Sequence, residues 1–232
     1  MRVECIAFDL DGTLIDSLPG LAEAVAAMRT RCGLGAAAQA SVASWIGRGT
    51  RVLVTRALQD GLGRDPDADE VERGHAMFVE AYGRTCESGS SLRPGARELL
   101  LRLFALGVPC AITTNKLESF AVQIATRLNI DSLLKTVIGG DTGERKPSPW
   151  MLHEAARRCG VDPGRGLLIG DSMIDVETAA AARWPVWLVD GGYGTPGSAA
   201  ALPPASRRFR DVPDLAHELL PLVQAGAVTL PK

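Results

Sequence analysis

Short apolar runs alternate with longer amphipathic segments along most of the chain. The strand-like runs lie at Val3–Phe8, Val108–Thr113, Thr136–Gly139, Gly166–Ile169 and Val186–Val189. The segments between the later runs have helical spacing of their apolar residues, at Pro94–Leu106, Ser119–Leu128, Pro149–Cys159 and Ile174–Ala182. Strands that alternate with helices of about 10–15 residues are typical of βαβ units. The pattern therefore predicts an α/β fold with a parallel sheet.

The stretch between residues 17 and 89 departs from this alternation because it contains no convincing strand. Its apolar positions recur with helical spacing in four segments, at Leu18–Cys32, Ala37–Ile46, Arg51–Leu62 and Asp69–Cys86. Ser88–Ser91 then has the composition of a flexible linker. We predict an all-helical domain at residues 17–89, inserted into an α/β core at residues 1–16 and 90–232. Its place beside the first strand suits a lid over a site, and a helical bundle without a gating role is the alternative.

The composition agrees with a soluble enzyme. The 232 residues are 46% hydrophobic, which is enough for a core, and the net charge of −2 gives no reason to expect nucleic-acid or membrane partners. No apolar run reaches the ~18 residues of a membrane-spanning helix, and the first strand begins at once, so we expect no signal peptide. Five scattered cysteines form no Cys-x-x-Cys motif. We expect them to be reduced in a cytoplasmic protein that is a monomer or a homodimer.

Two carboxylates follow the first predicted strand. Asp9 and Asp11 lie two residues apart, and Gly12 and Thr13 come next. Charges that leave solvent must be paired or must bind a metal, because an isolated buried charge costs several kcal/mol. Asp and Gly are also common in turns, so an Asp-rich turn without a function is the alternative.

Two further strands and one loop supply complementary polar groups. Thr114 and Asn115 follow the run that ends at Thr113, and Asp171 follows the run that ends at Ile169. Lys146 lies in the intervening loop Glu144–Pro147. Ligands of open α/β sheets bind at the carboxyl ends of the strands, so we expect these residues to form one site with Asp9.

Charge balance at this site predicts a metal. Asp9, Asp11, Asp171 and Asp175 carry about four negative charges, and Lys146 offsets one of them. A divalent cation would offset the excess of negative charge, and hard oxygen ligands favour Mg²⁺. Asp175 lies one helical turn after Asp171, and we expect it to contact a metal-bound water or Lys146 rather than the metal.

These four segments resemble, in their order along the whole chain, the haloacid dehalogenase-like (HAD) hydrolases. The shared patterns are Asp-x-Asp-x-Thr, a Thr after a strand, a Lys, and Gly-Asp-x-x-x-Asp. The chain looks most like the phosphoglycolate phosphatases of that superfamily, because of Trp45–Gly49, Thr114–Lys116 and Gly191–Gly194. The resemblance implies a Rossmann-like core with a helical cap in the first insertion point, in an enzyme of carbohydrate metabolism.

The resemblance also implies roles for the first two carboxylates. Asp9 is expected to attack phosphorus in line and form an aspartyl-phosphate intermediate. Asp11 is expected to protonate the leaving alkoxide and later to deprotonate the attacking water. A dehalogenase needs no acid for its halide and typically lacks the second aspartate, so Asp11 favours phosphoryl chemistry.

The remaining roles concern the phosphate and the metal. Thr114 and Lys146 are expected to hold the phosphate oxygens, with Asn115 either as a further donor or only as a turn residue. Asp9 and Asp171 are expected to bind Mg²⁺ through their carboxylates, and the resemblance assigns Asp11 to the metal through its backbone carbonyl.

Substrate choice is expected to depend on the helical domain. Arg48 lies between Gly47 and Gly49, which let the backbone approach a ligand closely. Its guanidinium could clamp a carboxylate such as that of phosphoglycolate, and a surface residue in a tight turn is the alternative.

The leading prediction is an Mg²⁺-dependent phosphatase for a small phosphorylated metabolite, namely 2-phosphoglycolate, which it converts to glycolate and phosphate. One alternative is a phosphomutase of the β-phosphoglucomutase type, which needs a second phosphate-binding group in the cap. Another is a phosphatase of broad specificity for sugar phosphates or nucleotides. A non-catalytic HAD-fold binding domain is the alternative of a different class, although it has no need for an acid beside a nucleophile.

Overall fold

The computed structural model describes residues 2–194, 202–224 and 228–229. Its strands are β1 (Arg2–Val3), β2 (Cys5–Phe8), β3 (Ile15–Asp16), β4 (Ser91–Leu92), β5 (Cys110–Thr113), β6 (Thr136–Ile138), β7 (Gly166–Gly170), β8 (Val186–Val189), β9 (Arg207–Phe209) and β10 (Val228–Thr229). Its helices are α1 (Leu18–Arg31), α2 (Gln39–Trp45), α3 (Thr50–Leu62), α4 (Ala68–Thr85), α5 (Ala96–Ala105), α6 (Glu118–Arg127), α7 (Trp150–Cys159), α8 (Met173–Ala182) and α9 (Val212–Gln224), with a 3₁₀ turn at Asp131–Leu133.

Within the described ranges, six strands form one parallel sheet in the order β6-β5-β2-β7-β8-β9. The expected α/β class with a parallel sheet is therefore confirmed. The chain passes from β2 to β5 on one side, and it reaches β7 on the other side of β2. Such a reversal of strand order opens a crevice at the carboxyl end of the central strand. Asp9 directly follows β2 and therefore lies at this crevice.

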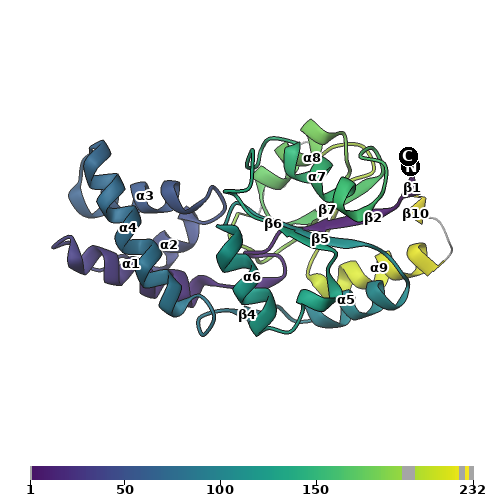
Figure 1. The fold of residues 1–232 in the computed structure, drawn as a ribbon, viewed down its shortest axis with the longest axis horizontal. Helices are drawn as coiled ribbons and strands as arrows, with labels where there is room; N and C mark the ends of the chain where they lie inside the picture. The colour runs from purple at the N-terminus through teal and green to yellow at the C-terminus, as the bar shows by residue number, and fades with distance from the viewer. Residues whose placement is uncertain (1, 195–201, 225–227, 230–232) are drawn as a thin grey trace.

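Helices cover both faces of the parallel sheet (Figure 1). Alternate side chains of β2 pack against the two layers. Ile6 and Phe8 belong to the core cluster that includes buried residues of α5, α6 and α9. Cys5 and Ala7 belong to the cluster formed with α7 and α8. Successive residues of a strand point to opposite faces, so a continuous apolar run in β2 fits a strand that is covered on both sides.

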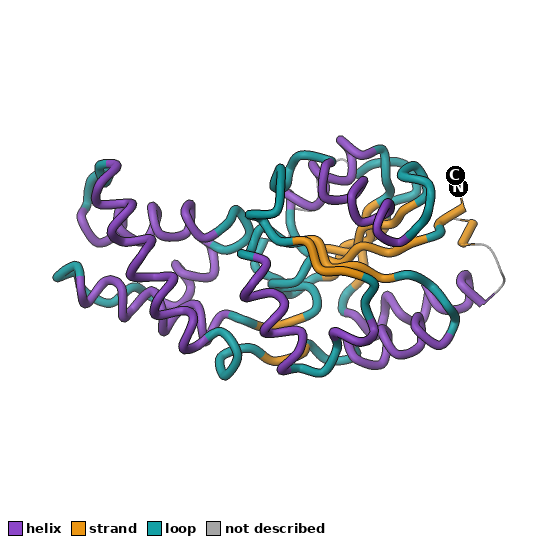
Figure 2. Tube along the Cα trace, in the orientation of Figure 1, coloured by secondary structure: helices purple, strands orange, loops and turns teal. Residues whose placement is uncertain are grey.

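Helices α1 to α4 pack on one another beside the carboxyl ends of the parallel strands (Figures 1 and 2). Their contact surfaces are apolar and contain the buried residues Leu21, Val25, Leu53 and Phe78. None of the helices in the described parts of the chain is long and apolar enough to cross a membrane.

The two connections between this helical layer and the sheet form a short antiparallel ribbon. Ile15 pairs with Leu92, and Asp16 pairs with Ser91. The expectation of a flexible linker at Ser88–Ser91 is wrong, because this segment is packed. A Cβ atom on Gly89 would lie only 2.3 Å from the Cα atom of Gly20, so the two backbones touch. The Gly89 N–H donates to the carbonyl of Thr85.

Candidate active site

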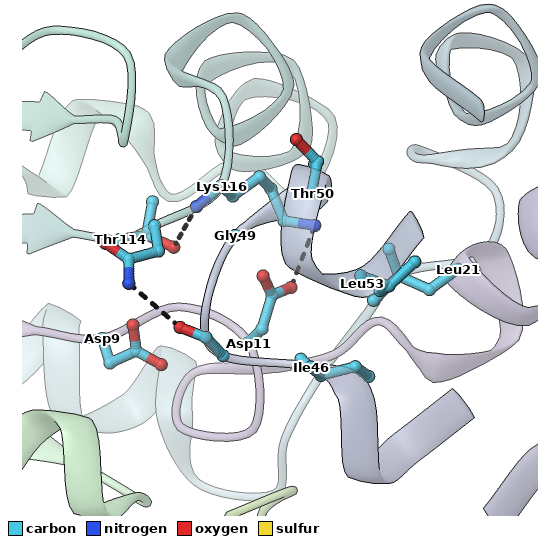
Figure 3. Close-up of a pocket in the computed structure, with 11 residues that line it drawn as sticks. Asp9, Asp11, Leu21, Ile46, Gly49, Thr50, Leu53, Thr114 and Lys116 are labelled. Carbon is cyan, nitrogen blue, oxygen red and sulfur yellow. Dashed lines mark hydrogen bonds and ion pairs between the residues drawn. The ribbon is translucent and has the colours of Figure 1, made fainter. Parts of the chain in front are cut away.

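A small cavity lies between the carboxyl end of the sheet and the helical layer (Figure 3). Its sheet side is lined by Asp9, Asp11, Thr114, Asn115 and Lys116, and its helical side by Leu21, Ile46, Gly47, Gly49, Thr50 and Leu53. The cavity volume is about 30 Å³, which is room for only a few water molecules. The helical layer therefore covers the carboxylates that follow β2.

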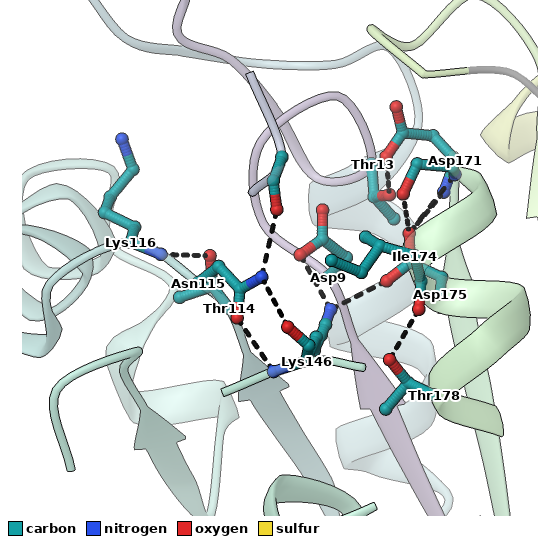
Figure 4. Close-up of polar contacts among 12 residues, drawn as sticks. Asp9, Thr13, Thr114, Asn115, Lys116, Lys146, Asp171, Ile174, Asp175 and Thr178 are labelled. Atoms are coloured by element: carbon teal, nitrogen blue, oxygen red, sulfur yellow. Dashed lines mark hydrogen bonds and ion pairs between the residues drawn. The ribbon is translucent and has the colours of Figure 1, made fainter. Parts of the chain in front are cut away.

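A buried lysine joins two of the carboxylates (Figure 4). The Lys146 Nζ atom lies 2.9 Å from Asp9 Oδ1 and 2.7 Å from Asp175 Oδ1. The side chains of Lys146 and Asp175 are 1% and 0% exposed. Burial raises the pKa of Asp9, Lys146 lowers it, and Asp175 and Asp171 raise it, so that this pKa remains well above its ordinary range. The expected contact between Asp175 and Lys146 is present.

Asp175 also holds the turn that leads from β7 into α8. Its Oδ2 atom accepts hydrogen bonds from the Ser172 N–H at 3.2 Å and from the Ser172 hydroxyl at 2.7 Å. A Cβ atom on Gly170 would lie 2.5 Å from the Asp175 carboxyl carbon. The carboxylate therefore fits only against a glycine at the end of β7.

Asp171 is held by several hydrogen-bond donors. The Thr13 hydroxyl donates to Oδ1 at 3.2 Å, and the Tyr193 and Gly194 N–H groups donate to Oδ2 at 2.8 and 3.3 Å. Burial and the charge of Asp175 raise the pKa of Asp171 to about 7, although these donors act in the opposite direction. Gly12, with φ +91°, passes so close that a Cβ atom there would lie 2.5 Å from Asp171 Oδ2.

These carboxylates fit a divalent cation. One oxygen from each of Asp9, Asp171 and Asp175 lies within 4.8 Å of the other two, and all three residues come from the sheet core. Burial first, and then the charges of neighbouring carboxylates, raise the pKa of Asp9 and of Asp171, and a bound cation would offset both effects. Oxygen ligands of this kind suit Mg²⁺.

Asp11 lies beside this cluster and faces the cavity. Its Oδ1 atom accepts a hydrogen bond from the Ser17 hydroxyl at 2.5 Å and lies 3.1 Å from Lys116 Nζ. Ser17 precedes α1, so a residue at the start of the helical layer orients the expected acid and base. Asp11 is partly accessible, with 12% of its side chain exposed, whereas the Lys116 side chain is 2% exposed.

Lys116 corrects the charge balance that the sequence suggested. Lys146 is not the only cation, since Lys116 pairs with Asp11 (Figure 3). Burial lowers the pKa of Lys116, but Asp11 and Tyr82 outweigh this effect and leave the pKa raised. Lys116 therefore stays charged. Two ammonium groups now face four carboxylates, and the remaining excess of negative charge still calls for a divalent cation.

Thr114 and Asn115 differ in what they can offer a phosphate. The Thr114 hydroxyl lines the cavity and accepts a hydrogen bond from the Lys116 N–H at 3.2 Å, which leaves its own proton free to donate. The Asn115 amide nitrogen donates to the carbonyls of Gly47 at 3.0 Å and Lys146 at 3.2 Å. Both of its donor protons are therefore used, and Asn115 joins three loops around the cavity instead of offering a donor to phosphate.

Arg48 lies on the loop that covers the cavity but does not line it. Its neighbours Gly47 and Gly49 are lining residues, whereas Arg48 is exposed. The arrangement brings together Asp9, Asp11, Thr114, Lys146, Asp171 and Asp175 and leaves Arg48 at the rim.

The sequence assigned no role to two residues that hold the site together. Tyr193 lies in the loop after β8, and its hydroxyl donates to Asp16 at 2.5 Å and accepts from the Ser17 N–H at 2.8 Å. Arg93 donates to the carbonyls of Gly12 and Gly191. Both residues connect the ribbon between the two layers to the loops around Asp171. Tyr193 stood in one of the motifs that suggested the subgroup, but a motif alone does not show which atoms meet.

Comparison with known proteins identifies the family of the chain. Residues 3–183 match the family model of the haloacid dehalogenase-like hydrolases. The chain is 40% identical over 189 residues to a phosphoglycolate phosphatase of Yersinia pestis, which covers 81% of both chains. It is 36% identical to a phosphoglycolate phosphatase of Nitrosococcus oceani over 82% of this chain and 85% of the relative. A crystal structure described as a predicted phosphoglycolate phosphatase from Haemophilus somnus superimposes with a TM-score of 0.85 at 31% identity, over 94% of this chain and 98% of the other.

Proposed function

This chain belongs to the haloacid dehalogenase-like hydrolases and is a phosphatase, and we propose that it hydrolyses 2-phosphoglycolate to glycolate and phosphate with the help of Mg²⁺. The observation that carries this proposal is the pairing of Asp9 with a buried lysine, next to a second aspartate that faces the same covered cavity. The names of the relatives support the substrate.

The proposed reaction begins at Asp9. Its carboxylate oxygen attacks phosphorus, the bond from phosphorus to the ester oxygen breaks, and the leaving alkoxide takes a proton from Asp11. Water then attacks the aspartyl phosphate, and Asp11 accepts the proton of that water. The products are glycolate and phosphate, and both aspartates return to their starting state.

The other residues would bind and orient the phosphate. Lys146 has a third donor proton beyond those directed at Asp9 and Asp175, and Thr114, whose hydroxyl can still donate, lines the cavity. Asp9 and Asp171 would hold Mg²⁺, together with the Asp11 carbonyl that the family resemblance suggests. When bound, the cation would neutralise the excess carboxylate charge and polarise the phosphoryl oxygens.

The cavity favours a small substrate over the sugar phosphates of a phosphomutase. Among the described residues, its helical side presents apolar side chains, glycine and Thr50, and no lysine or arginine for a second phosphate group. We propose that Arg48, being exposed, attracts the anionic substrate at the rim rather than clamping it inside. The five unpaired cysteines suit the reducing cytoplasm in which we propose that the enzyme works.

A panel of phosphorylated metabolites, assayed with Mg²⁺ and in excess EDTA, tests the proposal. We expect 2-phosphoglycolate to give the highest kcat/KM with Mg²⁺, and EDTA to abolish turnover. A clear preference for hexose phosphates or nucleotides would reject the substrate, and full activity in EDTA after dialysis would reject the metal.

A further inference from the structure

The cavity contains one cationic side chain whose purpose the phosphoryl chemistry does not explain. Lys116 is the single lysine or arginine among the described residues that line it. Lys146 forms ion pairs with Asp9 and Asp175. Lys116 instead forms an ion pair with Asp11, the proposed acid and base. Asp11 itself gives and takes the proton in the proposed reaction, so that reaction assigns no step to Lys116.

Lys116 is held rigidly by groups from both layers. Its Nζ atom donates to the Tyr82 hydroxyl at 2.5 Å and lies 4.5 Å from the centre of the Tyr82 ring. Tyr82 belongs to α4 and is itself packed between Phe78, with a stacked ring, and Phe120, with an edge contact. The ammonium group is therefore fixed in the arrangement in which the helical layer covers the site.

One donor of this ammonium group remains for a ligand. An ammonium carries three protons. One is directed at Tyr82 and one at Asp11, at 3.1 Å. The third has no partner among the contacts of the described residues, and Lys116 lines the cavity. A buried charge with an unused donor favours a ligand group that is anionic and can accept a hydrogen bond.

The position of Lys116 relative to the two aspartates indicates which part of a substrate it meets. Figure 3 shows the Asp11 carboxylate between Asp9 and the Lys116 ammonium group. A substrate whose phosphorus faces Asp9 and whose leaving oxygen faces Asp11 would extend the remainder of its leaving group toward Lys116. Because Lys116 Nζ lies only 3.1 Å from Asp11, a group that meets Lys116 must follow the leaving oxygen closely. Leu21, Ile46 and Leu53 make the helical wall of the cavity apolar.

We propose that Lys116 is the specificity-determining residue that binds the carboxylate of the leaving group, so that the enzyme selects phosphate esters of short hydroxy acids. This inference rests on the proposed function and assigns to Lys116 the carboxylate contact that the sequence suggested for Arg48. Neutral esters of the same length lack the anionic group that the third donor requires.

The test compares two phosphate esters that differ only at the distal group. 2-Phosphoglycolate carries a carboxylate, and 2-hydroxyethyl phosphate carries a hydroxymethyl group in its place. We expect Lys116→Met to lower kcat/KM for 2-phosphoglycolate by on the order of 10²-fold, as is typical for the loss of a charge-assisted hydrogen bond in a buried site. The value for 2-hydroxyethyl phosphate should change only a few-fold. Lys135→Met, at an exposed lysine directly before β6, should leave both values unchanged and controls for loss of a charge.

Two further variants keep the test decisive if Lys116→Met folds poorly. Lys116→Arg keeps the charge and should retain part of the preference for 2-phosphoglycolate. Tyr82→Phe keeps the lysine but removes the hydroxyl that positions it, and should lower the preference by a smaller factor than Lys116→Met.

The possible results separate this inference from the proposed function. If the wild-type enzyme shows no preference for 2-phosphoglycolate over 2-hydroxyethyl phosphate, the proposed substrate is wrong. If the wild-type enzyme has the preference and Lys116→Met lowers both kcat/KM values by the same factor, or leaves both unchanged, Lys116 does not bind the carboxylate. In that case the phosphatase assignment stands without it.

Discussion

Replacement of Lys146 with Met should destabilise the protein strongly, in a way that depends on pH. The ammonium group lies 2.9 Å from Asp9 and 2.7 Å from Asp175, and the Asp175 side chain is fully buried. Removing one partner of a buried ion pair costs about 3–5 kcal/mol, because the remaining charge is left without compensation. For a protein of this size, that loss lowers the melting temperature by about 6–20 °C.

The pH dependence follows from the state of Asp9. Its pKa is well above its ordinary range even with Lys146 present, and without the lysine a main factor that lowers this pKa is lost. Protonation removes the unpaired charge, so the penalty is present above the pKa of Asp9 and shrinks as the pH falls below it. We therefore expect Lys146→Met to lose more stability at about pH 8 than at about pH 5.5.

Urea unfolding in the absence of Mg²⁺, followed by circular dichroism at both pH values, measures this loss. Lys135→Met is the matched control, since it removes an exposed lysine and should unfold like the wild type. Lys146→Arg should recover part of the stability. An unfolding free energy for Lys146→Met that equals that of Lys135→Met at both pH values would refute the account of the buried ion pairs.

Three further predictions concern the acid, the metal site and the rim. Asp11→Ala should lower kcat by ~10²–10⁴-fold, measured by phosphate release, and a near-native rate would show that Asp11 is not the acid and base. Without Mg²⁺, the pKa of Asp171, raised from 3.8 to about 7, should make the folded protein lose stability as the pH rises across this range. Thermal unfolding should show that Asp171→Asn, or added Mg²⁺, reduces this fall, and identical pH profiles would contradict the raised pKa. Arg48→Ala should raise KM about two- to fivefold at low salt and have no effect at high salt, because exposed charges are screened. A loss that persists at high salt would instead indicate a direct contact inside the cavity.

The parallel sheet could be predicted because its strands are nearly continuous apolar runs. β8 was predicted to its exact bounds at Val186–Val189, and β2 and β7 differ from the prediction by one or two residues. Three elements near the carboxyl terminus were missed, and β10 (Val228–Thr229) is a strand of only two residues. β9 (Arg207–Phe209) is an edge strand with two arginines, so it lacks an apolar run, and α9 (Val212–Gln224) contains Pro213 and Pro221. Proline is tolerated in the first turn of a helix, but it obscures the helical pattern of the sequence.

The sequence predicted those site residues that directly follow a strand within a recognisable motif. Asp9, Asp171 and Asp175 meet because β2 and β7 are adjacent and parallel. The contacts of Lys116 with Tyr82, and of Tyr193 with Asp16, join residues 34 and 177 positions apart on different elements. Such contacts depend on how the helical layer docks on the sheet, which local spacing does not encode. For the same reason, the sequence left open whether Arg48 contacts substrate or lies at the surface, and the structure shows it exposed.

The central claim is that Asp9 is the nucleophile, and detection of the phosphorylated enzyme tests it most directly. The enzyme is mixed with Mg²⁺ and 2-phosphoglycolate labelled at phosphorus, quenched with acid during turnover, and digested for mass spectrometry. We expect an acid-stable phosphoryl group on Asp9 in the wild type, and no bound label and no turnover in a folded Asp9→Asn variant. Rapid release of phosphate by Asp9→Asn, or label on a residue other than Asp9, would contradict the account.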